Sequence, residues 1–321
     1  MIRTAECVSP MHPDKMCDRI SDTLLDIHLT HDSNSRVAIE TCGGNGLVYV
    51  TGEVTSEYKI TDEEIESVVK DITTDDSLKV ITNINIQSPE IAQGVDTGGA
   101  GDQGIMIGYA CRENSNWLPE EYNLARELNK MIFKYHPHDG KTQITILPNK
   151  KVVVVASFCK TPKNILEDLC RNFFATGEYK IKDLHCNPAG DWNIGGFTAD
   201  AGLTGRKLAV DNYGPRVPLG GGAFSGKDST KVDRSAAYMA RNIAVDYLLS
   251  NPNNQEVLVR LAYAIGYDKP LEATVIVDGK QSIINAYDLR PQSIIKTLGL
   301  KSPIFSETAK WGHMGAGFSW K

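Results

Sequence analysis

The segment from Gly220 to Asp233 places a run of glycines directly before two lysines and two aspartates. Glycines let backbone N–H groups approach phosphate oxygens closely, because no Cβ stands in the way. Lys227 and Lys231 can neutralise phosphate charge, and either Asp228 or Asp233 can ligate a hard cation. The segment therefore predicts a site for a metal-bound polyphosphate.

The same segment comes close to a P-loop motif but does not complete it. Gly221, Gly226 and Lys227 have the required spacing, whereas Asp228 occupies the position that needs Ser or Thr. We therefore reject the P-loop interpretation. An unrelated ATP-dependent kinase or ligase would need a Walker or kinase signature, and the sequence has neither.

A second group of candidates runs from His12 to Lys15 and joins an imidazole, a carboxylate and an ammonium. Pro13 marks the start of an expected helix, and the partial positive charge of a helix N-terminus favours anions. Phosphate with a divalent ion would suit this position. The alternative is a helix cap in which Asp14 and Lys15 are merely solvated, and these four residues alone leave both interpretations open.

Two further glycine-rich turns carry charged side chains. The turn Gly99–Gly104 presents Asp102 before an apolar strand, although such a segment alone is more often a turn than a site. The segment Asp200–Lys207 supplies a carboxylate, flexible backbone and the guanidinium fork of Arg206, which suits bidentate contacts to oxyanions. A charged surface turn remains the alternative there.

Cations gather in or beside these turns more consistently than any single motif. The candidates for polyphosphate binding are Lys141, Arg206, Lys207, Lys227 and Lys231. Together they match a site for about four negative charges with Mg²⁺. His136 and His138 flank a proline, but without a third ligand nearby they favour an exposed loop over a metal site.

Bulk composition limits the possible partners. Lysines and arginines number 34 against 40 acidic residues in a chain of 321, a net charge of −6, which argues against a general nucleic-acid or membrane-surface binder. The seven scattered cysteines include no C-x-x-C pair and favour reduced thiols. The first residues lack the apolar core of a signal peptide and no run of about 18 apolar residues occurs, so we expect a cytoplasmic protein.

The elements that must position these residues alternate between helix and strand, which predicts an α+β fold. Helices are expected at Lys15–His31, Thr61–Ile72, Glu120–Tyr135, Pro162–Phe174, Asp233–Leu249 and Pro291–Leu298. A capping pattern opens the second helix at Thr61, and Gly299 is expected to stop the last one. Strands are expected at Arg36–Thr41, Leu47–Val54, Leu78–Ile86, Ile105–Cys111, Gln143–Leu147, Val152–Phe158, Val257–Ile265 and Ala273–Val277. Three α+β domains are predicted, at residues 1–97, 98–194 and 195–321, although no repeat is evident in the sequence.

The charged glycine-rich segments closely resemble those of the S-adenosylmethionine synthetases, also called methionine adenosyltransferases. The matching stretches are Val8-Ser9 with His12–Lys15, Gly99–Gly104, Gly202–Lys207 and Gly220–Ser235, with weaker matches at Asp288–Pro291 and Trp311–His313. The resemblance thus covers nearly the whole chain, and Gly220–Ser235 is its most specific part.

The resemblance implies an activity, a fold and partners. Family members transfer adenosyl from ATP to the methionine sulfur, expel the triphosphate, and hydrolyse it to pyrophosphate and phosphate. They pack three similar α+β domains in a pseudo-threefold arrangement and place active sites between the subunits of a homodimer or a dimer of dimers. The implied substrates are ATP and L-methionine, and the implied cofactors are two Mg²⁺ per active site and one K⁺ per subunit.

Roles for individual residues also follow only from the resemblance. The implied catalytic residues are His12, Lys141, Arg206, Lys207, Lys227 and Lys231, with His12 near the 5′-oxygen. The implied ATP contacts are Asp139, Gly140, Lys141, Asp191, Trp192, Asp200, Arg206, Lys207, Ala223 and Lys227. The positions implied near methionine are Glu53, Gln87, Asp102, Asp200 and Lys231. Asp14 and Asp233 match Mg²⁺ ligands, and Glu40 matches the K⁺ ligand.

Two departures from the family bear on function. The lid between Gln87 and Asp102 is shorter than usual, which predicts looser methionine binding and easier product release. Asp191-Trp192 replaces the Arg-Phe pair of familiar bacterial members, so Trp192 is expected to stack on adenine while Asp191 accepts from its amino group. A non-catalytic relative is the other class of protein to weigh. It would be expected to have lost some of these charged residues, whereas all of them are present.

Overall fold

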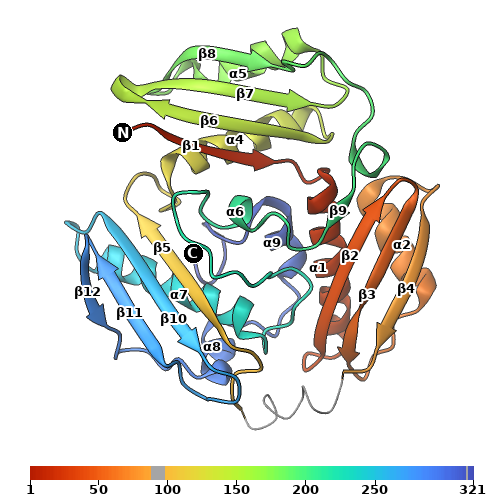
Figure 1. Ribbon diagram of the computed structural model, residues 1–321, viewed down its shortest axis with the longest axis vertical. Coiled ribbons are helices and arrows are strands. Elements are labelled where there is room, and N and C mark those ends of the chain that lie inside the picture. Colours follow the sequence, from red (N-terminus) through yellow and green to blue (C-terminus); the bar gives the residue numbers. More distant parts are fainter. Residues whose placement is uncertain (88–97, 316) are drawn as a thin grey trace.

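The computed structural model describes residues 1–87, 98–315 and 317–321. Its described part contains three four-stranded sheets arranged around a central region of helices and loops (Figure 1). Helices pack against each sheet, α1 and α2 on one, α4 and α5 on the next, and α7 on the last, with α8 packed on α7. The predicted α+β class is therefore confirmed.

The first sheet has the strand order β9-β2-β3-β4. Its strands and helices are α1 (Pro13–His31), β2 (Arg36–Gly44), β3 (Leu47–Thr55), α2 (Asp62–Thr73), β4 (Lys79–Asn85) and β9 (Gly202–Leu203). β2 and β3 form an antiparallel hairpin, and β4 lies parallel to β3 because α2 carries the chain back across the sheet.

The second sheet, β1-β6-β7-β8, repeats that pattern. Its elements are β1 (Arg3–Val8), α4 (Glu120–Tyr135), β6 (Gly140–Leu147), β7 (Lys151–Phe158), α5 (Lys163–Ala175) and β8 (Lys180–Cys186). β6 and β7 form the hairpin, and β8 is parallel to β7 after α5. The repeat that the sequence does not reveal is thus present in the topology.

The third sheet, β5-β10-β11-β12, is antiparallel throughout. It comprises β5 (Gly104–Cys111), α7 (Val232–Ser250), β10 (Glu256–Tyr263), β11 (Glu272–Val277), β12 (Lys280–Ile283) and α8 (Pro291–Leu298). The short helices α6 (Leu208–Asp211) and α9 (Phe305–Trp311) lie in the central region (Figure 1).

Strands cross between the three predicted sequence segments. β1 from the first segment pairs with β6 of the second, and β5 from the second pairs with β10 of the third. The three segments therefore do not each hold a sheet of their own. The positions of the domain boundaries, at 97/98 and 194/195, stay a prediction.

A buried ion pair joins α1 to α7 at the centre of the molecule. Arg234 of α7 donates from both terminal nitrogens to the two carboxylate oxygens of Asp22 on α1, at 2.6 and 2.8 Å. Both side chains are fully buried. The apolar residues of the first and third sheets form one continuous core around this pair, whereas the second sheet packs mostly on a core of its own.

Several helix ends follow their predicted signals. Thr61 caps α2 and forms a capping box with Glu64, and Gly299 ends α8 with a left-handed backbone (φ 67°). Six elements were not expected from the sequence: β1, β8, β9, β12, α6 and α9. β8 and β12 are mostly exposed edge strands, which lack the apolar alternation of a half-buried strand. No helix in the described residues has the length and apolar character needed to span a membrane.

Candidate active site

Four aspartates at intervals of four residues line one face of α1 and fasten distant loops to it. Each accepts hydrogen bonds from backbone N–H groups: Asp14 from Leu203, Asp18 from Gly205, Asp22 from Gly226, and Asp26 from Phe305 and Ser306, at 2.8 to 3.0 Å. This row of aspartates is buried or nearly so. It therefore fixes, from one helix, the loops that carry most of the predicted phosphate-binding cations.

His12 begins α1 and caps it. Its Nδ1 accepts from the backbone N–H of Asp14 at 3.2 Å, in agreement with the cap interpretation. The accompanying expectation that Asp14 and Lys15 are solvated is wrong, since these residues are 0% and 1% exposed. Lys15 instead donates to buried Asp211 at 2.7 Å.

Asp14 is surrounded by the cations of the Asp200–Lys207 segment. Arg206 donates from Nε to Oδ1 at 2.8 Å, and Lys207 donates from Nζ to Oδ2 at 2.5 Å. Burial works to raise the pKa of Asp14, but the hydrogen bonds from Lys207, Leu203 and Arg206 outweigh it and lower that pKa. The negative charge of Asp14 is therefore already balanced by Arg206 and Lys207 before any ligand binds.

The electrostatics of His12 connect the remaining members of this group. Burial, followed by the positive charge of Lys207, lowers the pKa of His12 to about 4, with a further lowering by Lys141 and opposing effects of Asp14 and Asp200. The imidazole is consequently neutral at pH 7. We call His12, Asp14, Lys141, Asp200, Arg206 and Lys207 the His12 cluster.

The second group of predicted residues surrounds the start of α7. Lys227 donates to Asp233 at 2.7 Å, and Lys231 forms a short ion pair with Asp228. Asp228 also accepts from the backbone N–H groups of Val37 and Thr230 at 2.7 and 2.8 Å, and only 1% of it is exposed. Of the two aspartates left open as cation ligands, Asp228 is thus committed to holding the loop.

Strands β2 and β3 bring two more carboxylates to this group. Ala38 of β2 bridges to Lys227 on one side and pairs with Glu53 of β3 on the other. Glu40 follows two residues later, and burial raises its pKa, opposed by Lys227 and reinforced by Glu53. Glu40, Glu53, Lys227, Lys231 and Asp233 form what we call the Lys227 cluster.

The same edge of β2 leads from one cluster to the other. Ala38 lies beside Lys227, and Cys42 pairs with Leu203, which precedes Arg206 and Lys207. Four residues of strand span roughly 13 Å. The two clusters within one chain therefore lie near the opposite ends of a short stretch of β2. Ala223 lies between them, since a Cβ added at Gly205 would meet its methyl group at 2.6 Å.

The predicted adenine contacts lie beyond the His12 cluster. Asp139 and Gly140 directly precede Lys141, and Asp139 accepts from the N–H of Gly196 at 2.9 Å, while burial raises its pKa to about 6. Asp191 accepts from Asn187 at 2.8 Å and from the N–H of Lys163 at the start of α5 at 3.0 Å. Trp192, the predicted stacking residue, is partly exposed beside it.

Two of the residues predicted near methionine are not joined to either cluster by a hydrogen bond or ion pair among the described residues. Asp102 is exposed, and within the described ranges it accepts only from its neighbour Gln103, at 2.8 Å. Gln87 is buried, and its Oε1 has no hydrogen-bond partner among the described residues. Most of the predicted short lid, including 94–97, lies outside the described residues.

The donors present suit hard cations. Asp14, Asp233 and Glu40 offer carboxylate oxygens, the ligands that Mg²⁺ and K⁺ accept. Within the described ranges, no three His, Cys, Asp or Glu side chains gather closely enough to hold a metal by themselves. Any Mg²⁺ held here would therefore need further ligands from phosphates or water, which is the usual arrangement for this ion.

The residues that hold the site together were not among those expected from the sequence. Asp18, Asp22 and Asp26 support the loops, and Arg234 joins α1 to α7. Their signal was available, because a carboxylate recurs every four residues from Asp14 onward and therefore lies on one face of the helix. Such a row is unusual on a helix whose side chains are mostly buried.

Comparison with known proteins gives one consistent result. The N-terminal, central and C-terminal domain models of S-adenosylmethionine synthetase match residues 1–93, 97–190 and 194–321. The S-adenosylmethionine synthases of Clostridium tetani and Sulfurimonas denitrificans are 39% and 40% identical to the chain, covering 97% and 100% of it and 93% of each relative.

A solved structure agrees with these matches. It is described as that of an unusual S-adenosylmethionine synthetase from Campylobacter jejuni, and it superposes with a TM-score of 0.88 at 32% identity. The match covers 99% of this chain and 96% of the other. With its predicted charged residues gathered at the starts of α1 and α7, the chain belongs to the S-adenosylmethionine synthetase family.

Proposed function

We propose that the His12 and Lys227 clusters are the two halves of the site at which this enzyme joins the methionine sulfur to C5′ of ATP. The reaction is that of methionine adenosyltransferases: it yields S-adenosylmethionine and triphosphate, which is hydrolysed to pyrophosphate and phosphate. Positive charge grows on sulfur while negative charge grows on the departing oxygen. The site must therefore hold cations at the triphosphate and carboxylates near the sulfur.

One observation carries this proposal. Each carboxylate proposed to bind Mg²⁺ is already paired with a cation proposed to bind phosphate: Asp14 with Lys207 and Arg206, and Asp233 with Lys227. When magnesium triphosphate enters, the cations can turn to phosphate oxygens and release the carboxylates. Charges are thus compensated before and after binding, which limits the cost of desolvating them.

The proposed cofactors are two Mg²⁺ per active site, at Asp14 and Asp233, and one K⁺ at Glu40. Bound there, Mg²⁺ would neutralise charge on the triphosphate. The chain's own contribution is positional. Gly222 leaves room beside Asp233, since a Cβ at that residue would lie 2.4 Å from the carboxylate carbon.

His12 would act on the leaving oxygen as a neutral hydrogen-bonding group. With a pKa of about 4 the imidazole is uncharged at pH 7, so it does not form a tight ion pair with the triphosphate of the substrate before the reaction. As charge develops on the 5′-oxygen, its remaining N–H can donate to that atom. In-line alignment of sulfur, carbon and oxygen can contribute roughly 7–11 kcal/mol.

The remaining residues would complete the site. Asp139, Gly140, Lys141, Asp191 and Trp192 are proposed to lie at the adenosine, with Ala223 and Asp200 close to the nucleotide. Glu53, Gln87, Asp102, Asp200 and Lys231 are proposed to lie at methionine. Asp191 already holds the start of α5 through one oxygen, which leaves its other oxygen for the adenine amino group.

A homodimer, or a dimer of dimers, would bring these parts together. Large apolar side chains are exposed on strands of the first and third sheets, among them Ile81 on β4, Ile105 on β5 and Ile283 on β12, at 38%, 54% and 71%. A second copy of the chain would cover such side chains and complete the site at the interface. We place the enzyme in the cytoplasm, with no membrane or nucleic-acid partner.

Mixing two inactive variants tests the shared site. If the His12 cluster of one subunit works with the Lys227 cluster of its partner, then Lys207→Met and Lys227→Met proteins should regain activity when their subunits are exchanged. Random pairing would restore about one quarter of the wild-type sites. Formation of S-adenosylmethionine, phosphate and pyrophosphate is the readout. No recovery despite exchange of subunits would place both clusters of a site in one chain.

A further inference from the structure

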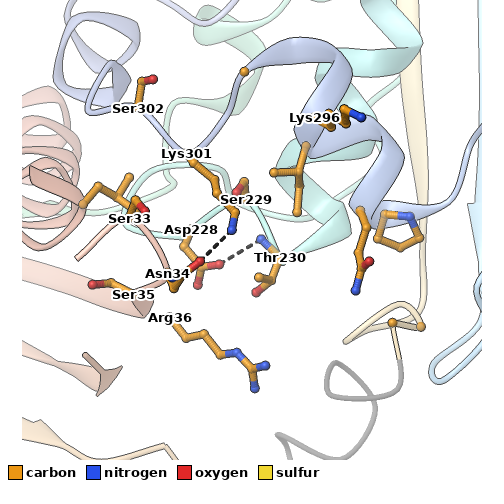
Figure 2. A pocket seen from close by; sticks show the side chains of 17 residues that line it. Ser33, Asn34, Ser35, Arg36, Asp228, Ser229, Thr230, Lys296, Lys301 and Ser302 are labelled. Carbon is orange, nitrogen blue, oxygen red and sulfur yellow. Dashed lines mark hydrogen bonds between the residues drawn. The ribbon is translucent and has the colours of Figure 1, made fainter. Parts of the chain in front are cut away.

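A cavity of about 680 Å³ lies between the end of α1, the turn 228–230 and α8 (Figure 2). A volume of this size accommodates a small organic molecule. None of the residues proposed to contact ATP or methionine is among those that line it.

Basic side chains outnumber acidic ones in the lining of this cavity within the described chain. Three basic residues line it, Arg36, Lys296 and Lys301, and its one acidic residue within the described chain is Asp228. That carboxylate is already compensated by Lys231 and two backbone N–H groups. Lys301 donates only to the neutral side chain of Asn34, at 2.6 Å, so its charge has no anionic partner among the described residues.

Hydroxyl groups and an apolar wall complete the lining. Ser229 is 6% exposed and its hydroxyl makes no hydrogen bond to the described residues, while the Thr230 hydroxyl is shielded from solvent and also without a partner there. Buried polar groups without partners are rare, and a bound water, ion or ligand is one way to satisfy them. Leu29, Pro291 and Ile295 supply apolar surface on the other side.

We propose that this cavity binds a small organic phosphate and that its occupancy tunes the methionine end of the active site. Lysines and serine or threonine hydroxyls recognise a phosphate dianion, and the apolar wall receives the organic part. Ser229 lies between Asp228 and Lys231, so a ligand held by its hydroxyl restrains the turn that positions Lys231. This second step rests on the proposed role of Lys231 at methionine.

Ribose 5-phosphate is the probe. The test is calorimetry on the full chain with its active site filled by S-adenosylmethionine and imidodiphosphate, which do not react further. Wild type should bind it more tightly than inorganic phosphate or ribose. Lys301→Met and Ser229→Ala should weaken binding at least tenfold, whereas Lys280→Met on the exposed strand β12 should not. No binding to wild type, or equal binding to Lys301→Met, would overturn the site.

The regulatory step has a separate readout. Ribose 5-phosphate should change the methionine KM of wild type at least twofold and leave that of Lys301→Met unaffected. Binding without any change in KM would overturn the coupling but not the site. If Lys231→Met leaves the methionine KM unchanged, the proposed function of Lys231 fails instead, and the calorimetric result still stands.

Discussion

The N-terminal turns of α1 and α7 are built alike but their aspartates are compensated to different degrees. Both helices have 19 residues, an aspartate at the second position, and a lysine from a glycine-rich loop paired with it. Asp14 receives two cations and a backbone N–H, and its side chain is 1% exposed. The structure gives Asp233 only Lys227 within the described residues, and its side chain is 11% exposed.

This difference indicates two levels of readiness for a metal. At Asp233 one lysine must move before a cation can reach the carboxylate. At Asp14 two cations must move, and a third donor, the N–H of Leu203, holds the side chain in place. The α7 end is therefore expected to accept Mg²⁺ more readily, whereas the α1 end waits for the triphosphate to draw its cations away.

The largest expected effect comes from separating the two helices. Arg234→Met leaves the buried carboxylate of Asp22 without its partner, which should lower the free energy of unfolding by about 3–5 kcal/mol. Denaturant unfolding measures this. Arg290→Met, which removes an exposed pair with Asp288, is the matched control and should leave stability unchanged. Equal effects of the two variants would contradict a central role for the Asp22–Arg234 pair.

The next effect distinguishes the two turns by catalysis. Lys227→Met removes the single cation beside Asp233 and should lower kcat/KM by roughly 10²–10³. Arg206→Met should cost about tenfold, because its side chain is half exposed and Lys207 remains on Asp14. Steady-state kinetics with saturating Mg²⁺ and K⁺ give both values. A larger loss for Arg206→Met would reverse the comparison.

A smaller effect concerns the proton on His12. Its pKa of about 4 lies below the ordinary 6.5, so the unfolded chain binds this proton more readily and stability should fall as the pH drops from 6.5 towards 4. NMR titration of the imidazole should show the low pKa in wild type. Lys207→Met should raise it, because Lys207 is the charge that lowers it most. An ordinary pKa in wild type would contradict the effect of burial and Lys207 on His12.

Residues with strong local backbone preferences predicted the ends of three helices. Pro13, Thr61 and Gly299 mark helix ends through their own backbone chemistry, and the structure agrees at each. The glycine-rich segments and their lysines also indicated phosphate chemistry. The short lid, by contrast, falls largely on residues outside the described part, so its effect on methionine binding stays a prediction.

Pairings across long distances in the chain were not predictable in this way. Asp14 and Arg206 are 192 residues apart, and nothing local in either segment indicates that they meet. The pairing of strands from different predicted segments, such as β5 with β10, was unpredictable for the same reason. The row from Asp14 to Asp26 was visible as a pattern, but its partners are backbone N–H groups, which any residue can supply.

The central claim is that lysine and arginine side chains already pair with the proposed Mg²⁺ ligands Asp14 and Asp233 before any ligand binds. Mg²⁺ binding in the absence of nucleotide tests this claim most directly. In Lys207→Met, one oxygen of Asp14 loses its partner, so calorimetry should show Mg²⁺ binding about tenfold tighter than to wild type, even though triphosphate binds more weakly. Adding Asp14→Asn should abolish the gain, and Lys141→Met, whose partner Glu6 is exposed, should show none. Unchanged or weaker Mg²⁺ binding in Lys207→Met would contradict the account.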